Sequence, residues 1–166
     1  MLIVVKVECR TFTSQGVEDT ITRMKTTIKD PDLYRLFENA YPNTLDTAIK
    51  WKGYAADNAE EELTFIITGD INAMWIRDSS NQMQSYLSLL NASSDPNSIA
   101  SLYRGVINLQ ARYLLISPYC NAFQAPVESG IPPAENDGSI DDIVYPPYSN
   151  TSVRFHVQMA RFKQYI

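Results

Sequence analysis

Cysteine, histidine and clustered positive charge are all scarce in this sequence. Only two of its 166 residues are cysteine and one is histidine, and Cys9 and Cys120 are too far apart for the ligand spacing of a zinc site. Lysine and arginine number 14 against 19 acids, which gives a formal net charge of -5, whereas nucleic-acid-binding domains usually carry a basic face. We therefore expect no zinc site and no nucleic-acid partner. We also expect no cofactor, and we assign no role to the single histidine, His156.

Long hydrophobic runs are also missing. The apolar opening, residues 2–5, is much shorter than a membrane span or the apolar core of a secretory signal. Two tripeptides, beginning at Asn91 and Asn150, nevertheless fit the N-glycosylation acceptor pattern. Cellular location therefore stays open, with a secreted parent as one alternative, and so does the choice between a Cys9–Cys120 disulfide and two buried thiols. Oligomeric state is not indicated either.

What the sequence does contain is ordinary globular composition, with 45% hydrophobic and 20% charged residues, and mostly helical periodicity. Apolar spacing and end signals predict helices at residues 14–28, 31–40, 75–90 and 95–116, with Ser94 or Asp95 as the cap of the last. The second helix is expected to resume over residues 43–51, before a turn from Lys52 to Glu62. β-Branched and aromatic residues predict one short strand at residues 63–68, ending at Gly69. Residues 119–149 are predicted to be a long loop, and residues 153–166 a basic amphipathic helix.

The predicted fold class is mainly α. The helices have clear apolar faces, but the last third of the chain supplies little to bury them against. A helical barrel is one fold in which every helix depends on both neighbours, so a few of its helices alone would expose apolar surface. A free-standing helical bundle is the alternative.

The densest group of polar residues follows Gly69, where a strand, a turn and a helix start are expected. Arg77 offers a planar set of donors while Asp70 and Asp78 accept, and the adjacent hydroxyls of a sugar need both kinds of partner. Trp75 could provide the apolar platform for a pyranose ring, and Gln82 lies near the start of the same helix.

Two other interpretations of these residues stay open. Arg77 could simply pair with Asp70 or Asp78 to hold the turn, with Trp75 in the core. Alternatively, Asp70 or Asp78 could be a catalytic carboxylate, because glycoside hydrolysis commonly uses two acids on either side of the bond.

The segment Thr68–Ser79, TGDINAMWIRDS, resembles the signature of glycoside hydrolase family 125, usually written TGDIPAMWLRDS. Ten of the twelve positions match; the departures are Asn72 in place of proline and Ile76 in place of leucine. Residues 9–12, 32–46 and 116–123 are also similar to this family, particularly to its fungal members. The resemblance runs from about Cys9 to Pro147.

The resemblance implies an (α/α)6-barrel exo-α-1,6-mannosidase that inverts the anomeric configuration without a metal ion and acts on a mannose-containing glycan. This chain would supply the N-terminal part of the barrel, with a short β element before the motif. No catalytic residue is carried over, because the general acid and base of the family are expected beyond this segment. The residues carried over to the mannose pocket are Asp70, Trp75, Arg77, Asp78 and Gln82, with Asn121 and Phe123 as weaker candidates.

Residues 1–148 are accordingly expected to form part of a catalytic domain. The resemblance stops at residues 149–166. A truncated gene model would produce a tail of this kind. The chain alone is then expected to be inactive. The alternative function is a non-catalytic carbohydrate-binding or interaction module of helical fold.

Overall fold

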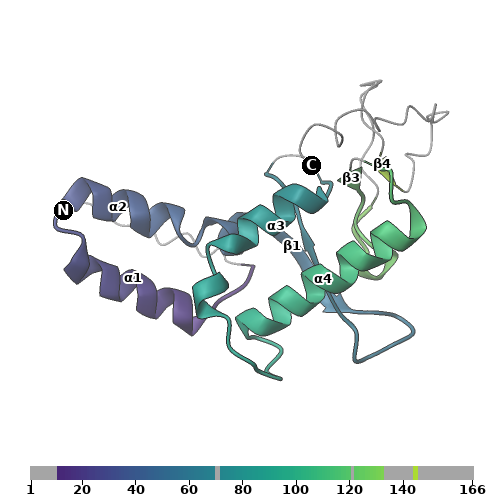
Figure 1. Ribbon diagram of the computed structural model, residues 1–166, viewed down its shortest axis with the longest axis horizontal. Coiled ribbons are helices and arrows are strands. Elements are labelled where there is room, and N and C mark those ends of the chain that lie inside the picture. Colours follow the sequence, from purple (N-terminus) through teal and green to yellow (C-terminus); the bar gives the residue numbers. More distant parts are fainter. Residues whose placement is uncertain (1–10, 70–71, 121, 133–143, 146–166) are drawn as a thin grey trace, which may run out of the picture.

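The computed structural model describes residues 11–69, 72–120, 122–132 and 144–145. Within these ranges the chain is mainly helical, as predicted from the sequence, and a small antiparallel hairpin lies at its centre (Figure 1). The predicted helix at residues 153–166 lies outside the described residues. Cys9 does too, so the choice between a Cys9–Cys120 disulfide and two buried thiols stays open.

Helices α1, Gln15–Thr27, and α2, Pro31–Ala40, lie side by side at one end of the molecule (Figure 1). The Asp30 side chain caps α2 by accepting hydrogen bonds from two backbone N–H groups, each at 2.9 Å, as expected for an aspartate just before the first turn. Val17 and Ile21 bury the inner face of α1. In contrast, Leu33 and Leu36 on α2 are 55% and 64% exposed, while Phe37 is half-buried against the core, so the apolar face predicted for this helix is only partly covered within the described chain.

The hairpin pairs β1, Ile49–Tyr54, with β2, Glu62–Ile66, in antiparallel register. A π-helical turn, η1, Thr44–Ala48, precedes it. The prediction that the helix would resume over residues 43–51 was therefore wrong after residue 48, and Lys52–Tyr54 belong to β1, not to the turn. β-Branched and aromatic residues favour extended backbone, and Trp51 pairs with Phe65 across the hairpin. The predicted strand at 63–68 is confirmed as β2, which begins one residue earlier and ends two residues earlier than predicted.

Helix α4, Ile99–Ile116, packs along β2. Its buried residues follow the predicted stripe: Ile99, Leu102, Val106, Leu109 and Tyr113. The approach is close at Gly105, where an added Cβ would lie 2.2 Å from Thr64 Oγ1. The cap is Ser98, whose hydroxyl accepts from Ser101 N at 3.1 Å. The prediction of Ser94 or Asp95 was wrong because the Asp95 carboxylate instead accepts from Asn97 N at 2.8 Å, in a turn before the helix.

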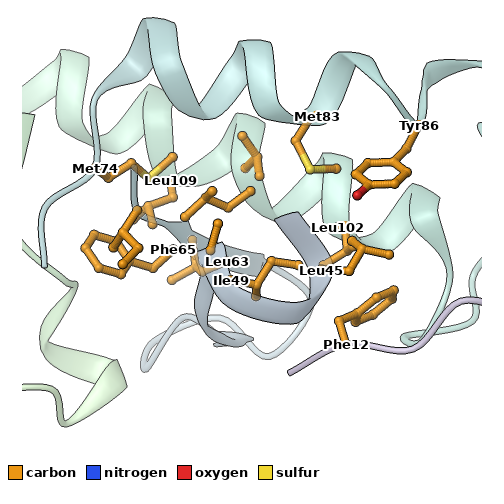
Figure 2. Packing of buried hydrophobic residues seen from close by; sticks show 14 of the residues in the cluster. Phe12, Leu45, Ile49, Leu63, Phe65, Met74, Met83, Tyr86, Leu102 and Leu109 are labelled. Carbon is orange, nitrogen blue, oxygen red and sulfur yellow. The ribbon is translucent and has the colours of Figure 1, made fainter. Parts of the chain in front are cut away.

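Helix α3, Ile76–Gln84, is shorter than the predicted helix at 75–90, and a 3-10 turn, η2, Leu87–Leu89, follows it. Figure 2 shows Met74, Met83 and Tyr86 reaching from α3 and its flanking residues into the core that also contains Leu109. The Tyr86 hydroxyl donates to the Tyr41 carbonyl at 2.7 Å, and burial raises the pKa of Tyr86 to about 12. The second half of the predicted helix is thus replaced by a turn that lets Tyr86 enter the core.

The predicted loop at residues 119–149 contains short regular elements within its described part. Strands β3, Ala122–Phe123, and β4, Val144–Tyr145, pair in parallel, and a 3-10 turn, η3, Val127–Ser129, lies between them in sequence. Within the described ranges, no helix combines the length and apolar character needed to cross a bilayer. The Cys120 thiol lies 2.9 Å from the Ser117 hydroxyl.

Candidate functional site

The motif segment, residues 68–79, connects the end of β2 to the first turn of α3. It is anchored at Met74, which is fully buried and exchanges two backbone hydrogen bonds with Phe123, at 2.7 and 3.0 Å. Because these bonds fix the backbone directly before Trp75, they set where α3 begins. The candidate site therefore rests on a short bridge between two segments that are about fifty residues apart in sequence.

Trp75 occupies the N-cap position of α3, with extended backbone and a half-buried side chain. It packs against Ala73 and Ala122, both of which are fully buried. The indole is therefore supported underneath by small residues while part of it remains accessible. This arrangement leaves an apolar surface of the kind on which the C–H face of a sugar can rest.

Arg77 and Asp78 lie next to each other in the first turn of α3 and form an ion pair. The Arg77 Nη2 atom is 3.1 Å from Asp78 Oδ2, and the side chains are 80% and 31% exposed. This pair agrees with the interpretation, given above from the sequence, that Arg77 pairs with a neighbouring aspartate. An exposed pair of this kind contributes only about 0–1 kcal/mol, so its donors and acceptors can be redirected to a ligand at small cost.

Gln82 lies one helical turn after Asp78 and therefore on the same face of α3. Its side chain is half-buried, and its Oε1 atom is buried without a hydrogen-bond partner in the described part of the chain. A buried acceptor without a partner costs roughly 1–3 kcal/mol. Gln82 is accordingly the candidate whose polar group has the most to gain from a further contact.

The remaining candidates differ in placement. Asp70 and Asn121 lie outside the described residues, so their assignment stays a prediction. Phe123 is fully buried, and its ring stacks on Tyr113 with centroids 4.4 Å apart and an interplanar angle of 9°. The Tyr113 hydroxyl donates to the Gln124 carbonyl at 2.6 Å. In this arrangement Phe123 supports the motif from within the core and presents no ring face to solvent.

A residue that the sequence reasoning missed, Gln110, contacts the motif from α4. Its Nε2 atom lies 2.9 Å from Ser79 Oγ and 3.0 Å from Ser80 Oγ. It also lies 3.2 Å from the Ile76 carbonyl oxygen. The position of Gln110 beside the buried residues of its helix could have suggested a contact with a neighbouring element. The sequence alone does not tell which helix it contacts.

The most buried carboxylate described near the hairpin, Glu62, is a structural group. It accepts hydrogen bonds from Ser101 and Arg104, both at 2.5 Å. Desolvation acts to raise the pKa of Glu62, but these hydrogen bonds and the positive charges of Arg104 and Lys52 outweigh it and hold the pKa below its ordinary value. A general acid needs a raised pKa, so Glu62 is unsuited to that role.

A second charged cluster forms around Arg112, which pairs with Glu61 at 2.7 Å and with Glu128 at 2.8 Å. The pKa of Glu61 is lowered, chiefly by its hydrogen bond from Arg112. This cluster ties the hairpin turn to η3. In the part of the chain that the structure describes, no group of three or more histidine, cysteine or acidic side chains is arranged to hold a metal ion.

Comparison with known proteins gives two matches. Residues 30–157 match the family model described as metal-independent α-mannosidase, glycoside hydrolase family 125. The chain is also 49% identical over 140 residues to the meiotically up-regulated gene 157 protein of Schizosaccharomyces pombe. That alignment covers 84% of this chain and 26% of the relative, so the chain spans about a quarter of the relative's length. The chain belongs to glycoside hydrolase family 125.

Proposed function

We propose that this chain is the N-terminal part of an inverting exo-α-1,6-mannosidase and that its motif segment forms one wall of the mannose pocket. Family membership supports a glycosidase that acts on α-linked mannose. The observation that carries the proposal for the pocket is the exposed Arg77–Asp78 pair beside the half-buried Trp75. Together they offer donors, acceptors and an apolar face within two turns of backbone, which is what one face of a pyranose requires.

We assign these residues to binding and none to proton transfer. An inverting glycosidase needs a carboxylic acid to protonate the leaving oxygen and a carboxylate to activate water, about 6.5–9.5 Å apart. Arg77 and Asp78 would orient the sugar hydroxyls, Gln82 would accept from a further hydroxyl, and Trp75 would support the ring. Asp70 and Asn121 are proposed to complete the same wall, with Phe123 beneath it.

The proposed architecture is part of an (α/α)6 barrel. On α4 the side chains of Ile107, Leu114 and Leu115 are 60%, 45% and 85% exposed and share the helix face opposite the hairpin, at i, i+7 and i+8. Because the chain spans 26% of the relative's length, we propose that this face is covered by a further helix of the same catalytic domain. The chain alone would then be incomplete and inactive.

The proposed boundary is residue 148, with residues 149–166 as a divergent tail, although the family match extends to residue 157. Reading the genomic DNA downstream of the codon for Tyr148 tests this, because a family-like continuation there would identify the tail as a gene-model artefact. The parent protein is the product of the complete open reading frame that contains this chain.

Activity is tested by incubating the parent protein with α-1,6-linked mannobiose and following the products by proton NMR. We expect mannose release with β-mannose appearing first, because inversion of an α linkage gives the β anomer. An α anomer appearing first would refute inversion, and no hydrolysis would refute the mannosidase proposal. In the latter case, calorimetric titration of the chain with mannose would identify a binding module if heat of binding were still observed.

The pocket wall is tested separately with Arg77→Ala and Asp78→Asn. Hydrogen bonds that involve a charged group contribute about 1.5–3 kcal/mol, so each substitution should lower kcat/KM about tenfold to a hundredfold. Arg35→Ala is the matched control, because Arg35 is an exposed arginine on α2, away from the motif. If Arg77→Ala and Arg35→Ala had equal kcat/KM, the assignment of Arg77 to the pocket would be refuted.

A further inference from the structure

Gln110 connects the middle of α4 to the first turn of α3. Its side-chain amide contacts three oxygen atoms there: the Ser79 and Ser80 hydroxyls at 2.9 and 3.0 Å and the Ile76 carbonyl at 3.2 Å. Ser79 is 1% exposed, so this contact is largely shielded from water. Hydrogen bonds in such surroundings are electrostatically stronger than exposed ones.

The directions of these hydrogen bonds are mutually consistent. Ser79 Oγ donates to the Trp75 carbonyl at 2.7 Å, and Ser80 Oγ donates to the Ile76 carbonyl at 2.7 Å. Because each hydroxyl uses its own proton on a backbone carbonyl, its oxygen is left to accept from the Gln110 amide. The result is a network that runs from α4 through two serines to the backbone at Trp75 and Ile76, immediately before Arg77.

A second polar contact pins the other end of α3 to the same helix. The Tyr103 hydroxyl donates to the Met83 carbonyl at 2.6 Å, and Met83 is buried in the core. Helix α3 is thus fixed at its C-terminal end by Tyr103 and at its N-terminal end by Gln110. Loss of the Gln110 contact would leave this C-terminal anchor and the Met74–Phe123 backbone bridge before Trp75 in place. It would loosen the turn between them, which carries Arg77 and Asp78.

We propose that Gln110 is a positioning residue for the sugar-binding side chains of α3. It touches no substrate; it sets the direction in which Arg77 and Asp78 project by fixing the backbone of the first turn. This inference rests on the proposed function of the motif segment. Misplacement of binding groups by about 1 Å can lower the rate about a hundredfold, so loss of the Gln110 contact is expected to affect sugar binding more than stability.

The test compares Gln110→Met with Asn108→Leu in the parent protein. Asn108 is the matched control because its amide also leaves α4 to bind a backbone carbonyl, that of Glu62 on β2, at 3.0 Å. Both changes remove a side-chain amide from α4 and keep side-chain size. We expect a similar fall in Tm for the two variants, but about a tenfold rise in KM for α-1,6-mannobiose in Gln110→Met alone, with a smaller change in kcat.

Amide hydrogen exchange supplies a readout that does not depend on catalysis. Gln110→Met should speed exchange at the Ser79 and Ser80 amides, and Asn108→Leu should not. If exchange increases but KM is unchanged, Gln110 has only a structural role and the proposal is wrong; unchanged exchange would also overturn it. If the wild-type parent releases no mannose, the proposed function fails and the positioning role fails with it, while exchange still reports whether the network holds α3.

If Gln110→Met does not fold, Ser80→Ala provides a second test of the proposal. It removes one of the two hydroxyls and leaves the Gln110 side chain in place. We expect KM to rise about threefold to tenfold with a smaller change in kcat, because the Gln110 amide then has one acceptor fewer on the first turn of α3. An unchanged KM in the folded Ser80→Ala variant would overturn the proposal.

Discussion

Gly105→Ala is the substitution for which the structure makes the sharpest stability prediction. Gly105 lies on α4 where the helix crosses β2, and an added Cβ would meet three atoms at less than 3.0 Å. These are Thr64 Oγ1 at 2.2 Å, Thr64 N at 2.9 Å and the Leu63 carbonyl carbon at 2.9 Å. The two backbone atoms belong to a strand that is buried along its whole length, so they cannot rotate away as a side-chain end could.

The magnitude follows from two opposing effects. Relief of the overlap requires α4 to move outward from β2, and overpacking of a buried site costs about 1–3 kcal/mol. Replacement of glycine by alanine within a helix returns up to roughly 1 kcal/mol through helix propensity. The expected net result is a destabilisation of about 0–2 kcal/mol, whereas helix propensity alone would stabilise.

Gly16→Ala provides the control. Gly16 also lies in a helix, α1, but the nearest atom to its added Cβ is Leu89 Cδ1 at 3.7 Å, an ordinary contact distance. We expect this substitution to stabilise the protein by about 0.5–1 kcal/mol. Both variants should be measured in the parent protein by urea unfolding. If Gly105→Ala were as stable as Gly16→Ala, the close approach of α4 to β2 would be refuted.

Three further predictions concern single groups. Tyr113→Phe keeps the ring but removes the hydrogen bond that the Tyr113 hydroxyl donates to the Gln124 carbonyl, and should lower the free energy of unfolding by about 0.5–1.5 kcal/mol in a thermal melt. The pKa of Glu62 is below its ordinary value of 4.5, so its charge contributes stability above that pH that is lost as pH falls through the folded pKa. Glu62→Gln should therefore lower stability at neutral pH and flatten its decline below pH 4.5, as followed by urea unfolding at several pH values. Asn91 is exposed, so we expect an Asn150→Gln variant, which lacks the other acceptor tripeptide, to carry an endoglycosidase-sensitive glycan when directed into a yeast secretory pathway. Adding Asn91→Gln should abolish this glycan, and adding Asn97→Gln should not.

The sequence predicted the helices best where local signals and burial agree. In α4, apolar residues at helical spacing are also the residues that β2 covers, so the predicted stripe and the buried stripe coincide. Residues 49–51 were mispredicted as a continued helix, and residues 52–54 as part of a turn, because both looked acceptable locally. Antiparallel pairing with β2 decides their conformation instead, since Ile49 pairs with Ile66 and Tyr54 with Glu62, and pairing of this kind overrides local propensity.

The candidate site was predicted in part for a similar reason. The clustering of Trp75, Arg77 and Asp78 at a helix start follows from their adjacency in sequence, and the structure places all three there. The contact from Gln110 depends on how α3 packs against α4, which the spacing within either helix does not determine. Ser98 was missed as the cap of α4 because Asp95 and Pro96 form an equally plausible helix start until the turn at Asn97 is known.

Helix α4 carries three separable roles on three faces. Leu109 and its neighbours fill the core against β2, Gln110 holds the first turn of α3, and Ile107 and Leu115 are left exposed. If the exposed face were simply solvent-facing, polar substitutions there would be neutral or favourable. If a further helix covers it, as proposed for the complete domain, Leu115→Glu would destabilise the parent protein by several kcal/mol while improving the solubility of the isolated chain. Opposite effects of one substitution in the two contexts would therefore identify this face as an internal surface of the barrel, whereas equal effects in both would leave the barrel without support from α4.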